Sequence, residues 1–432
     1  MDFKKYITDF KSNNMIVNDE LLYIANVKLA GYLGLILLID PNSPKMFGFN
    51  VYHIIATFIL IFLSIIMSFC IAGLYFWSYN IVTFSTLIEI IINGCFMVYK
   101  ILTVMRYSKN IWNLLNFTRI DFMKYMYHDR GVLEKCRERS LRSTNLFSLM
   151  CYCICLVWTI IPLILRNHYL TIKTRDGIVI KYHLNVYSVS FMVSETFYND
   201  NFYAFYLIES IFGMCSLHCS VLYDIFLISA CYALSSQLKT LNNSYKLLGL
   251  RATKKDKIDL NKKYNQINDP SLLDEIKCII VDHQVLIKKM EELYDIVRPV
   301  ILTQLVISSN TLIFMSFMIS LTLINKTDAN LIEIVKMLSA LPIFVLQLYL
   351  DCFLFGNIDK QKNDLNFSIY SSDWINMDSK CSKLILFAMR MNNANPLTMK
   401  ITYSKIVNLE MFVNVIRLSY STISVLMKSN MK

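Results

Sequence analysis

Long apolar stretches separated by polar segments recur along this chain of 432 residues. A membrane-spanning helix needs about 20 mainly apolar residues, and six stretches reach that length without interruption. They cover residues 51–75, 79–105, 143–165, 203–236, 299–324 and 331–355. A seventh is split into a short piece at 384–391, a helix-breaking sequence from Asn392 to Pro396, and a long apolar helix at 402–428. The pattern predicts an all-α, polytopic membrane protein with seven transmembrane helices.

The same pattern predicts a single unit covering residues 1–432 and no separate soluble domain. Its parts are an N-terminal segment at 1–50, four helices within 51–236, a polar loop with helix extensions at 237–298, and three helices within 299–428. Residues 21–39 are apolar but contain Lys28, which is costly at the bilayer centre. We therefore expect an amphipathic or partly embedded helix there, ended by Asp40-Pro41.

Composition supports the membrane class. Hydrophobic residues make up 55% of the chain and charged residues only 17%, against about 25% in an ordinary soluble protein. The mean hydropathy is +0.43. These values exclude an ordinary soluble enzyme, a disordered protein and a disulfide-stabilised secreted module.

The basic residues predict the orientation of the chain. With seven spans the loops alternate between two sides, and 30 of the 43 lysines and arginines lie in the set that contains the N-terminal segment. Only six lie in the other set. Because cytoplasmic loops are enriched in lysine and arginine, the N-terminus is expected in the cytoplasm and the C-terminus outside. This is opposite to a G-protein-coupled receptor, and it leaves an inverted seven-helix receptor, a channel or a transporter.

No motif indicates catalysis, a metal or a cofactor. The twelve cysteines contain no CxxC, and the ten glycines form neither GxGxxG nor a Walker loop. No Ser-His-Asp or Cys-His set is evident. The net charge of +11 is explained by the loops, so it does not indicate nucleic-acid binding. We expect a protein that is not an enzyme and has no cofactor.

Ionisable and aromatic residues inside the spans are candidates for a site. Glu89, Glu209, Asp224, Asp351, Glu410 and Arg417 fall within predicted helices, where charged groups are rare and often functional. Trp158 lies in the outer half of the third helix. Tyr206, Phe212, Met337 and Leu338 lie at similar depth on other helices. Such a layer suits a pocket for a small apolar ligand, and it suits ordinary helix packing almost as well.

The C-terminal part of the chain carries several short motifs in a specific order. They are Asp282-His283-Gln284 with Leu286 and Leu293, Phe355-Gly356-Asn357, Tyr370 and Trp374, the run from Arg390 to Leu397, Leu409-Glu410-Met411-Phe412, and Ser419-Tyr420-Ser421. In order and spacing these motifs resemble the insect odorant receptor family, most specifically over residues 276–428. Leu426-Met427 replaces the Gln-Phe typical of gustatory receptors. The loop between the fourth and fifth helices is shorter than in the odorant co-receptor, which favours a ligand-binding tuning subunit.

The resemblance implies an odorant-gated, non-selective cation channel in the plasma membrane of sensory neurons. Four subunits, including the odorant co-receptor, would each contribute the 402–428 helix to a central pore, surrounded by membrane lipid. The implied pocket for a small volatile organic ligand comprises Ser85, Ile88, Glu89, Cys155, Trp158, Tyr206, Phe212, Met337, Leu338 and Leu341. The implied pore and gate residues are Ile423, Met427, Tyr420 and Glu410. A homomeric gustatory-type channel and a secondary transporter are the alternatives.

Overall fold

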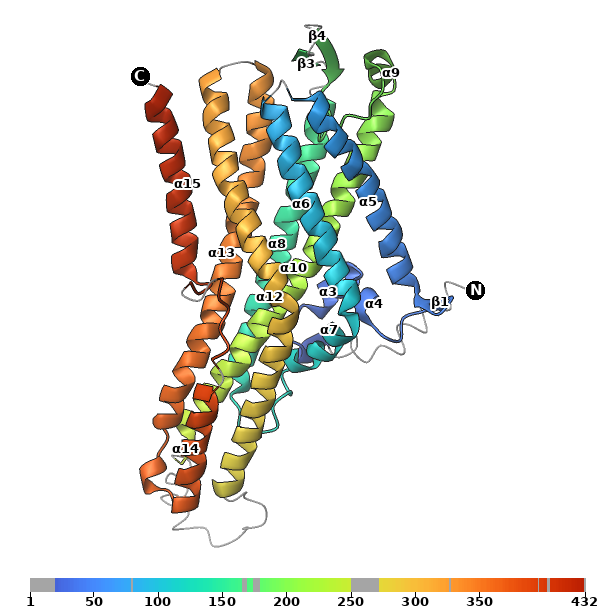
Figure 1. Ribbon diagram of the computed structural model, residues 1–432. Coiled ribbons are helices and arrows are strands. Elements are labelled where there is room, and N and C mark those ends of the chain that lie inside the picture. The colour runs from blue at the N-terminus through green and yellow to red at the C-terminus, as the bar shows by residue number, and fades with distance from the viewer. Residues whose placement is uncertain are drawn as a thin grey trace.

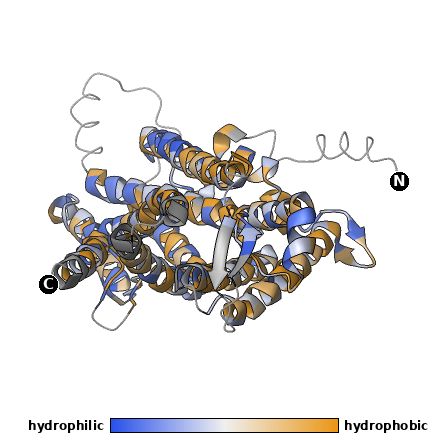
Figure 2. Cartoon of the chain, turned by 90° about the horizontal axis from the view of Figure 1, so that it is seen from above, coloured by the Kyte–Doolittle hydropathy of each residue, from blue (hydrophilic) through white to orange (hydrophobic). Residues whose placement is uncertain are grey.

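The computed structural model describes residues 20–78, 81–164, 169–173, 179–249, 272–325, 328–394, 396–401 and 405–430. Six of the described helices are long and apolar enough to cross a membrane. They are α5 (Val51–Phe76), α6 (Ile81–Arg106), α8 (Arg130–Ile164), α10 (Phe202–Leu247), α12 (Leu272–Asn325) and α13 (Asp328–Tyr370). They run up and down side by side in one elongated bundle (Figures 1 and 2). The prediction of a helical, polytopic membrane protein is confirmed.

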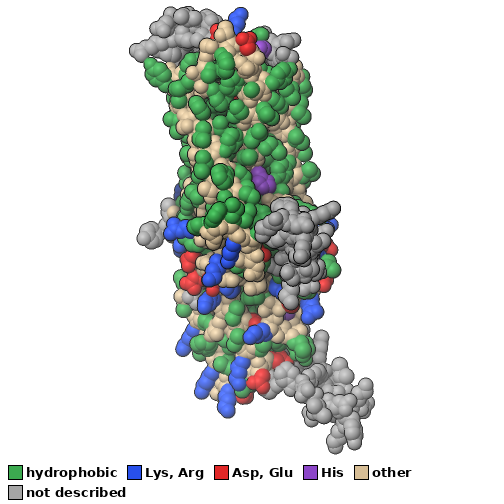
Figure 3. All heavy atoms as spheres, turned by 90° about the vertical axis from the view of Figure 1, so that its right-hand side faces the viewer, with side chains coloured by type: hydrophobic (Ala, Val, Ile, Leu, Met, Phe, Trp, Pro, Cys, Tyr) green, Lys and Arg blue, Asp and Glu red, His purple; other side chains and the backbone are tan. Residues whose placement is uncertain are grey.

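Several of these helices are much longer than a membrane is thick. The helix α10 has 46 residues and α12 has 54, whereas about 20 residues cross the hydrocarbon layer. Figure 3 shows the reason: below its upper tip, the upper part of the visible face carries many hydrophobic and few charged side chains, and charged side chains gather over its lower part. The helices therefore continue from a membrane-embedded part into a water-exposed lower bundle. We define the lower bundle as residues 237–247, 272–298 and 356–370 together with α14 (Ser379–Ala394).

The first described segment contains two short helices where a single one was expected. Following the 3-10 turn η1 (Glu20–Leu22), the chain forms α3 (Val27–Tyr32) and α4 (Leu35–Ile39). Gly34 separates them with a φ of +85°, a left-handed conformation that glycine adopts without strain. Asn26 accepts a hydrogen bond from the N–H of Leu29 and thereby caps α3. Its amide donates to Thr144 on α8 at 2.8 Å, which ties this segment to the bundle.

The remaining short elements lie at the edges of the bundle. The hairpin β1 (Lys45–Met46) and β2 (Phe49–Asn50) precedes α5, and α7 (Ser108–Leu115) with the 3-10 turn η2 (Asn116–Thr118) follows α6. The antiparallel hairpin β3 (Tyr169–Lys173) and β4 (Val179–His183) pairs Tyr169 with His183 and Lys173 with Val179. It lies with α9 (Glu195–Asp200) at the upper end (Figure 1).

Several of the motif residues connect the lower bundle to neighbouring parts of the chain. Asp282 accepts hydrogen bonds from the backbone N–H groups of Lys124 and Tyr125, at 3.0 and 2.9 Å. Asn357 on α13 donates to Ser235 on α10 at 2.6 Å. These polar groups are satisfied by partners far away in sequence, so they fix how the helices pack.

The seventh apolar segment is broken more widely than the sequence suggested. The helix α14 continues to Ala394 and packs in the lower bundle, beside α12 and α13. After the 3-10 turn η4 (Trp374–Asn376) and α14, the final helix α15 (Leu409–Asn430) begins at Leu409 rather than at residue 402. It lies beside the upper parts of α12 and α13 (Figure 1). The count of seven spans and the orientation in the membrane stay predictions.

A buried ion pair joins the helices within the membrane-embedded part. The ammonium of Lys100 on α6 lies 2.7 Å from a carboxylate oxygen of Asp224 on α10, and both side chains are almost fully buried. Gln347 on α13 donates to the other oxygen of Asp224 at 3.0 Å. Gln304 on α12 donates to Asp351 on α13 at 2.8 Å. Four helices are thereby connected by polar contacts in one layer.

We expect Lys100→Met to lower the free energy of unfolding by about 3–5 kcal/mol, because it leaves the Asp224 carboxylate buried without its cation. The measurement is the melting temperature of the purified protein in detergent. The control Lys109→Met removes an exposed lysine from the nearby helix α7 and should change little. The double variant Lys100→Met/Asp224→Asn should recover most of the loss. A double variant no more stable than Lys100→Met would contradict this explanation.

Candidate functional site

A cavity of about 220 Å³ lies in the upper half of the bundle. For comparison, an apolar cavity of about 150 Å³ in a protein core can hold a benzene molecule. Five helices and the segment after β4 line this cavity. The lining residues on α6 are Thr83, Thr86, Glu89, Ile90, Asn93, Gly94 and Met97. Those on α8, on the segment and on α10 are Cys151, Ile154, Cys155, Trp158, Val186, Tyr187, Ser188, Phe212, Gly213, Ser216 and Leu217. Those on α12 and α13 are Thr311, Phe314, Met315, Lys336, Met337, Ala340, Ile343 and Phe344.

Three aromatic side chains form one wall of the cavity. The Tyr187 ring lies between those of Trp158, with centroids 5.7 Å apart, and Phe212, at 5.6 Å. Gly213 leaves room for this ring, since a Cβ there would lie only 2.6 Å from the Tyr187 hydroxyl oxygen. The indole N–H of Trp158 donates to Ser339 on α13 at 3.0 Å. The ring contacts, the close approach of Gly213 and the hydrogen bond to Ser339 thus fix the wall. It offers flat apolar surfaces to a small molecule.

A segment at residues 185–189 covers the cavity and is held by two buried charges. The Glu209 carboxylate accepts hydrogen bonds from the backbone N–H groups of Tyr187, Ser188 and Val189, at 2.6, 3.1 and 3.1 Å. Lys336 donates to the carbonyl oxygens of Asn185 and Val186, at 3.0 and 3.2 Å. Charge-assisted hydrogen bonds of this kind are stronger than neutral ones. They fix the backbone that places Tyr187 in the wall.

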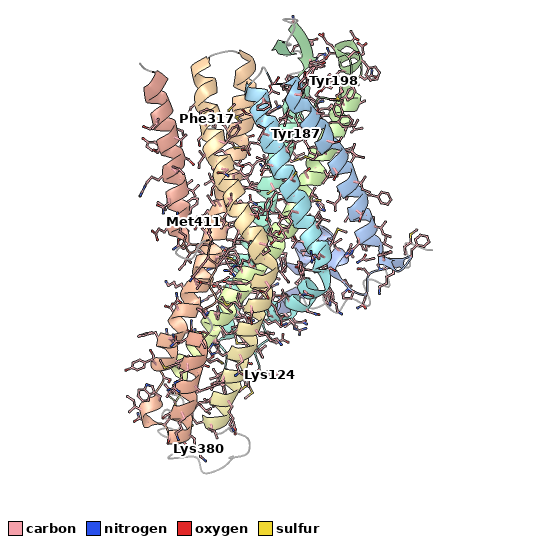
Figure 4. All side chains as sticks on the ribbon, viewed as in Figure 1. Lys124, Tyr187, Tyr198, Phe317, Lys380 and Met411 are labelled. Carbon is pink, nitrogen blue, oxygen red and sulfur yellow. The ribbon has the colours of Figure 1, made fainter. Side chains whose placement is uncertain are left out.

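The cover segment is also packed from above by α9. The amide of Asn185 donates to the Tyr198 hydroxyl at 3.0 Å, and the Tyr198 ring stacks on Phe205 with centroids 4.8 Å apart. Burial raises the pKa of the Tyr198 hydroxyl well above its usual value, so this group is neutral at physiological pH. Tyr187 and Tyr198 both lie in the upper part of the molecule (Figure 4).

A polar cluster interrupts the apolar lining on the side of α6 and α12. One carboxylate oxygen of Glu89, Oε2, accepts hydrogen bonds from the Thr311 hydroxyl at 2.8 Å and from the Asn93 amide at 3.2 Å. The same Asn93 amide also lies 2.9 Å from the backbone carbonyl oxygen of Glu89. The cavity therefore combines an aromatic wall with one carboxylate, which gives it both apolar and polar contacts to offer.

The structure brings half of the proposed pocket residues together. Glu89, Cys155, Trp158, Phe212 and Met337 line the cavity. Ser85, Ile88, Tyr206, Leu338 and Leu341 are not among the lining residues. Leu338 is 51% exposed on the outer surface of α13, and the Tyr206 hydroxyl donates to the Thr159 carbonyl oxygen at 2.9 Å. These differences arise because depth along a helix can be read from sequence, whereas the face that turns inward depends on packing.

Sequence reasoning missed the contributions of α12 and of the cover segment. Thr311, Phe314 and Met315 lie in a stretch that is apolar on most sides, so no periodicity marks an inward face. Tyr187 lies in an irregular segment for which no pattern predicts a position. The one available signal was Glu209, an acidic residue inside a predicted span, since such a residue needs partners nearby.

The proposed pore residues lie on α15. Tyr420 is 71% exposed and Glu410 is also exposed, while Ile423 is partly buried. The side chain of Met427 lies outside the described part of the structure. Among the described residues, no group of three His, Cys, Asp or Glu side chains is placed to hold a metal ion.

The fold and the cavity define the class of protein: a helical, multi-pass membrane protein with a ligand-sized cavity among its apolar helices. Residues 80–420, most of the chain, match the family described as 7tm Odorant receptor. The chain belongs to the insect odorant receptor family, as its motifs predicted. It is therefore a membrane receptor and not an enzyme.

Individual relatives agree with this assignment. The chain is 26% identical to Odorant receptor 94a of Drosophila melanogaster over 183 residues. That match covers 42% of this chain and 44% of that receptor, so it spans less than half of the relative. Two structures of the olfactory receptor OR5 from Machilis hrabei share the fold, each over 93% of this chain and 98% of that chain. The complex with eugenol has a TM-score of 0.68 at 16% identity, and the other structure has 0.69 at 15%.

We expect Gly213→Ala to disturb the aromatic wall, because its new Cβ would lie 2.6 Å from the Tyr187 hydroxyl and 2.9 Å from the ring. The control is Gly94→Ala on the same cavity, where the new Cβ meets the end of the flexible Met67 side chain. Gly213→Ala should lower the melting temperature clearly more than Gly94→Ala. Equal effects of the two substitutions would show that Tyr187 is not fixed as described.

We expect Glu209→Ala to loosen the cover segment, because it removes the acceptor of three backbone N–H groups. Hydrogen–deuterium exchange of the amides of residues 187–189 should become faster, whereas exchange in the middle of α5 should not change. Glu209→Gln retains one acceptor oxygen and should give an intermediate rate. Unchanged exchange in Glu209→Ala would refute the assigned role.

Proposed function

We propose that this chain is the ligand-binding subunit of an odorant-gated, non-selective cation channel in the plasma membrane of sensory neurons. A small volatile organic molecule binds in the cavity, and a pore lined by α15 opens in a complex of four subunits that includes the odorant co-receptor. The observation that carries the proposal is the cavity itself. It is lined by five membrane-embedded helices and lies in the half of the bundle predicted to face outward.

The lining of the cavity favours small, mainly apolar ligands. Such a ligand gains free energy chiefly by removing apolar surface from water and by dispersion contacts with the aromatic wall. Because Tyr187, Trp158 and Phe212 are held by neighbouring groups, little side-chain freedom is lost on binding. The related receptor OR5 forms a complex with eugenol, a small organic molecule, which agrees with a ligand of this size.

The surface of α15 supports its place at a pore. Glu410, Asn414, Arg417 and Ser421 are spaced three or four residues apart, so they share one side of the helix, and all four are exposed. We call this side the polar face of α15. Polar and charged groups at membrane depth are costly in contact with lipid, so this face suits water or another subunit. A single chain surrounded by lipid provides neither water nor another subunit next to this face. The polar face therefore favours an assembly around α15.

Ile423 and Met427 form the proposed gate. They lie four residues apart in the sequence, a spacing that places two positions on one side of a helix, and an apolar constriction can close a pore by excluding water. At 100° per residue they lie on a different side of the helix from the polar face. A rotation or tilt of α15 would therefore exchange an apolar for a polar lining, which is a simple way to open a pore.

The helices α12 and α13 connect the cavity to α15. Both contribute lining residues, and both pack against α15. The rings of Tyr349 on α13 and Phe412 on α15 meet with centroids 5.6 Å apart. A ligand shifts such an equilibrium only if it binds the open arrangement more tightly than the closed one. A change in how α12 and α13 surround the ligand would be passed directly to α15.

The test of this function is the current evoked by a panel of volatile compounds in cells that express the chain with and without the co-receptor. We expect a ligand-evoked cation current only with the co-receptor. Current from this chain alone would indicate a homomeric, gustatory-type channel. Proton- or sodium-coupled uptake in place of current would indicate a transporter.

Met337→Ala should raise the half-maximal ligand concentration by roughly tenfold, because a buried methionine of the cavity lining is lost. Val335→Ala is the matched control on the same helix, where the side chain is 52% exposed on the outer surface. Surface expression is measured for both variants. If the two substitutions shift the concentration–response curve equally, the cavity is not the ligand site.

A further inference from the structure

Glu89 is the acidic residue of the cavity lining, and none of the described cations pairs with it. The charged residues of the lining are Glu89 and Lys336. Lys336 donates to two carbonyl oxygens of the cover segment and lies close enough to Glu209 to interact with it electrostatically. Lys336 is therefore directed to the cover segment, and neither of these hydrogen bonds joins its ammonium to Glu89. No salt bridge of the described residues involves Glu89.

The hydrogen bonds of Glu89 leave one oxygen available. Both the Thr311 hydroxyl and the Asn93 amide donate to the same atom, Oε2. Within the described structure, Oε1 receives no hydrogen bond from the protein. A carboxylate in this position lacks a cation and at least one further donor, and a molecule in the cavity could supply both.

Depth makes an uncompensated carboxylate costly. Glu89 lies eight residues from the start of α6, which is about 12 Å along the helix axis and within the apolar part of the bundle. A charge at such a depth is strongly favoured to pair with an opposite charge. The other wall of the cavity offers the faces of Trp158, Tyr187 and Phe212, which suit an apolar or aromatic group.

We propose that the cavity is selective for small amphiphilic amines. The protonated nitrogen of the ligand binds Glu89 Oε1, and its apolar part packs against the aromatic wall. This inference rests on the proposed function, in which the cavity is the ligand site. A neutral ligand of the same shape leaves the carboxylate without a cation, and sites built around a buried polar group discriminate strongly against ligands that leave it unpaired.

Three probes of nearly equal shape test the inference: 2-phenylethylamine, 2-phenylethanol and propylbenzene. Binding is measured as the ligand-induced rise in melting temperature of the purified protein, which does not require gating. Evoked current in cells with the co-receptor is the second measurement. The wild-type protein should bind the amine at least about tenfold more tightly than propylbenzene.

The variant Glu89→Gln keeps the size of the side chain and removes its charge. It should weaken binding of 2-phenylethylamine by about tenfold or more and leave propylbenzene binding within about twofold. The control Glu195→Gln removes a carboxylate of α9 that binds the Lys181 backbone N–H away from the cavity, and it should preserve the preference for the amine. If Glu89→Gln does not fold, Glu89→Asp retains the charge and should still prefer the amine.

The outcomes separate this inference from the proposed function. If the neutral probes bind as tightly as the amine, or if the Glu89→Gln variant keeps the preference, the amine inference is overturned and the cavity stands as a ligand site. If 2-phenylethylamine fails to bind folded wild-type protein while other volatile compounds bind, only the amine inference fails. If a broad panel of volatile compounds neither binds nor evokes current, both are overturned.

Discussion

The contact between Lys100 and Asp224 is the constraint on which the arrangement of the membrane-embedded helices depends. Neither charge is tolerated alone in an apolar bundle, so each requires the other at 2.7 Å. This requirement fixes α6 against α10, and the bond from Gln347 adds α13 to the same point. Hydrophobic contacts between membrane helices are weakly directional, because lipid tails offer similar surfaces. The ion pair therefore supplies a directional restraint that apolar packing does not.

The cavity lies between that ion pair and a second pair of ionisable residues. The polar layer of Lys100 and Asp224 lies just below the cavity, since Met97 of the lining is one turn from Lys100 on α6. Glu209 and Lys336 hold the cover segment above it. Polar contacts of Lys100 and Asp224 below the cavity, and of Glu209 and Lys336 above it, thus hold the helices on both sides of the space. A space can remain there without the surrounding helices collapsing into it.

The helices, their order and the membrane class could be predicted from the sequence, because hydrophobic length depends only on composition. Individual pocket residues could be predicted only in part. Met337 lines the cavity and Leu338 faces outward, although the two are neighbours in an apolar run without periodicity. Tyr187 could not be predicted, because its position depends on hydrogen bonds to Glu209 from a segment without regular structure. The start of α15 at Leu409 was placed too early, although Asn408 directly before it is a residue type that often caps helices and does accept a hydrogen bond from the Met411 N–H.

The polar face of α15 has a consequence for the life of the protein in the cell. In the proposed assembly, a newly inserted chain would hold Glu410, Asn414 and Arg417 against lipid until other subunits surround them. The exposed polar groups would raise the free energy of the isolated subunit relative to the assembled one. By mass action, the stability of the subunit would then depend on the concentration of its partners. A cell that makes the proposed complex would then set the number of receptors at its surface by controlling synthesis of the partner alone, with surplus chains removed as unassembled subunits.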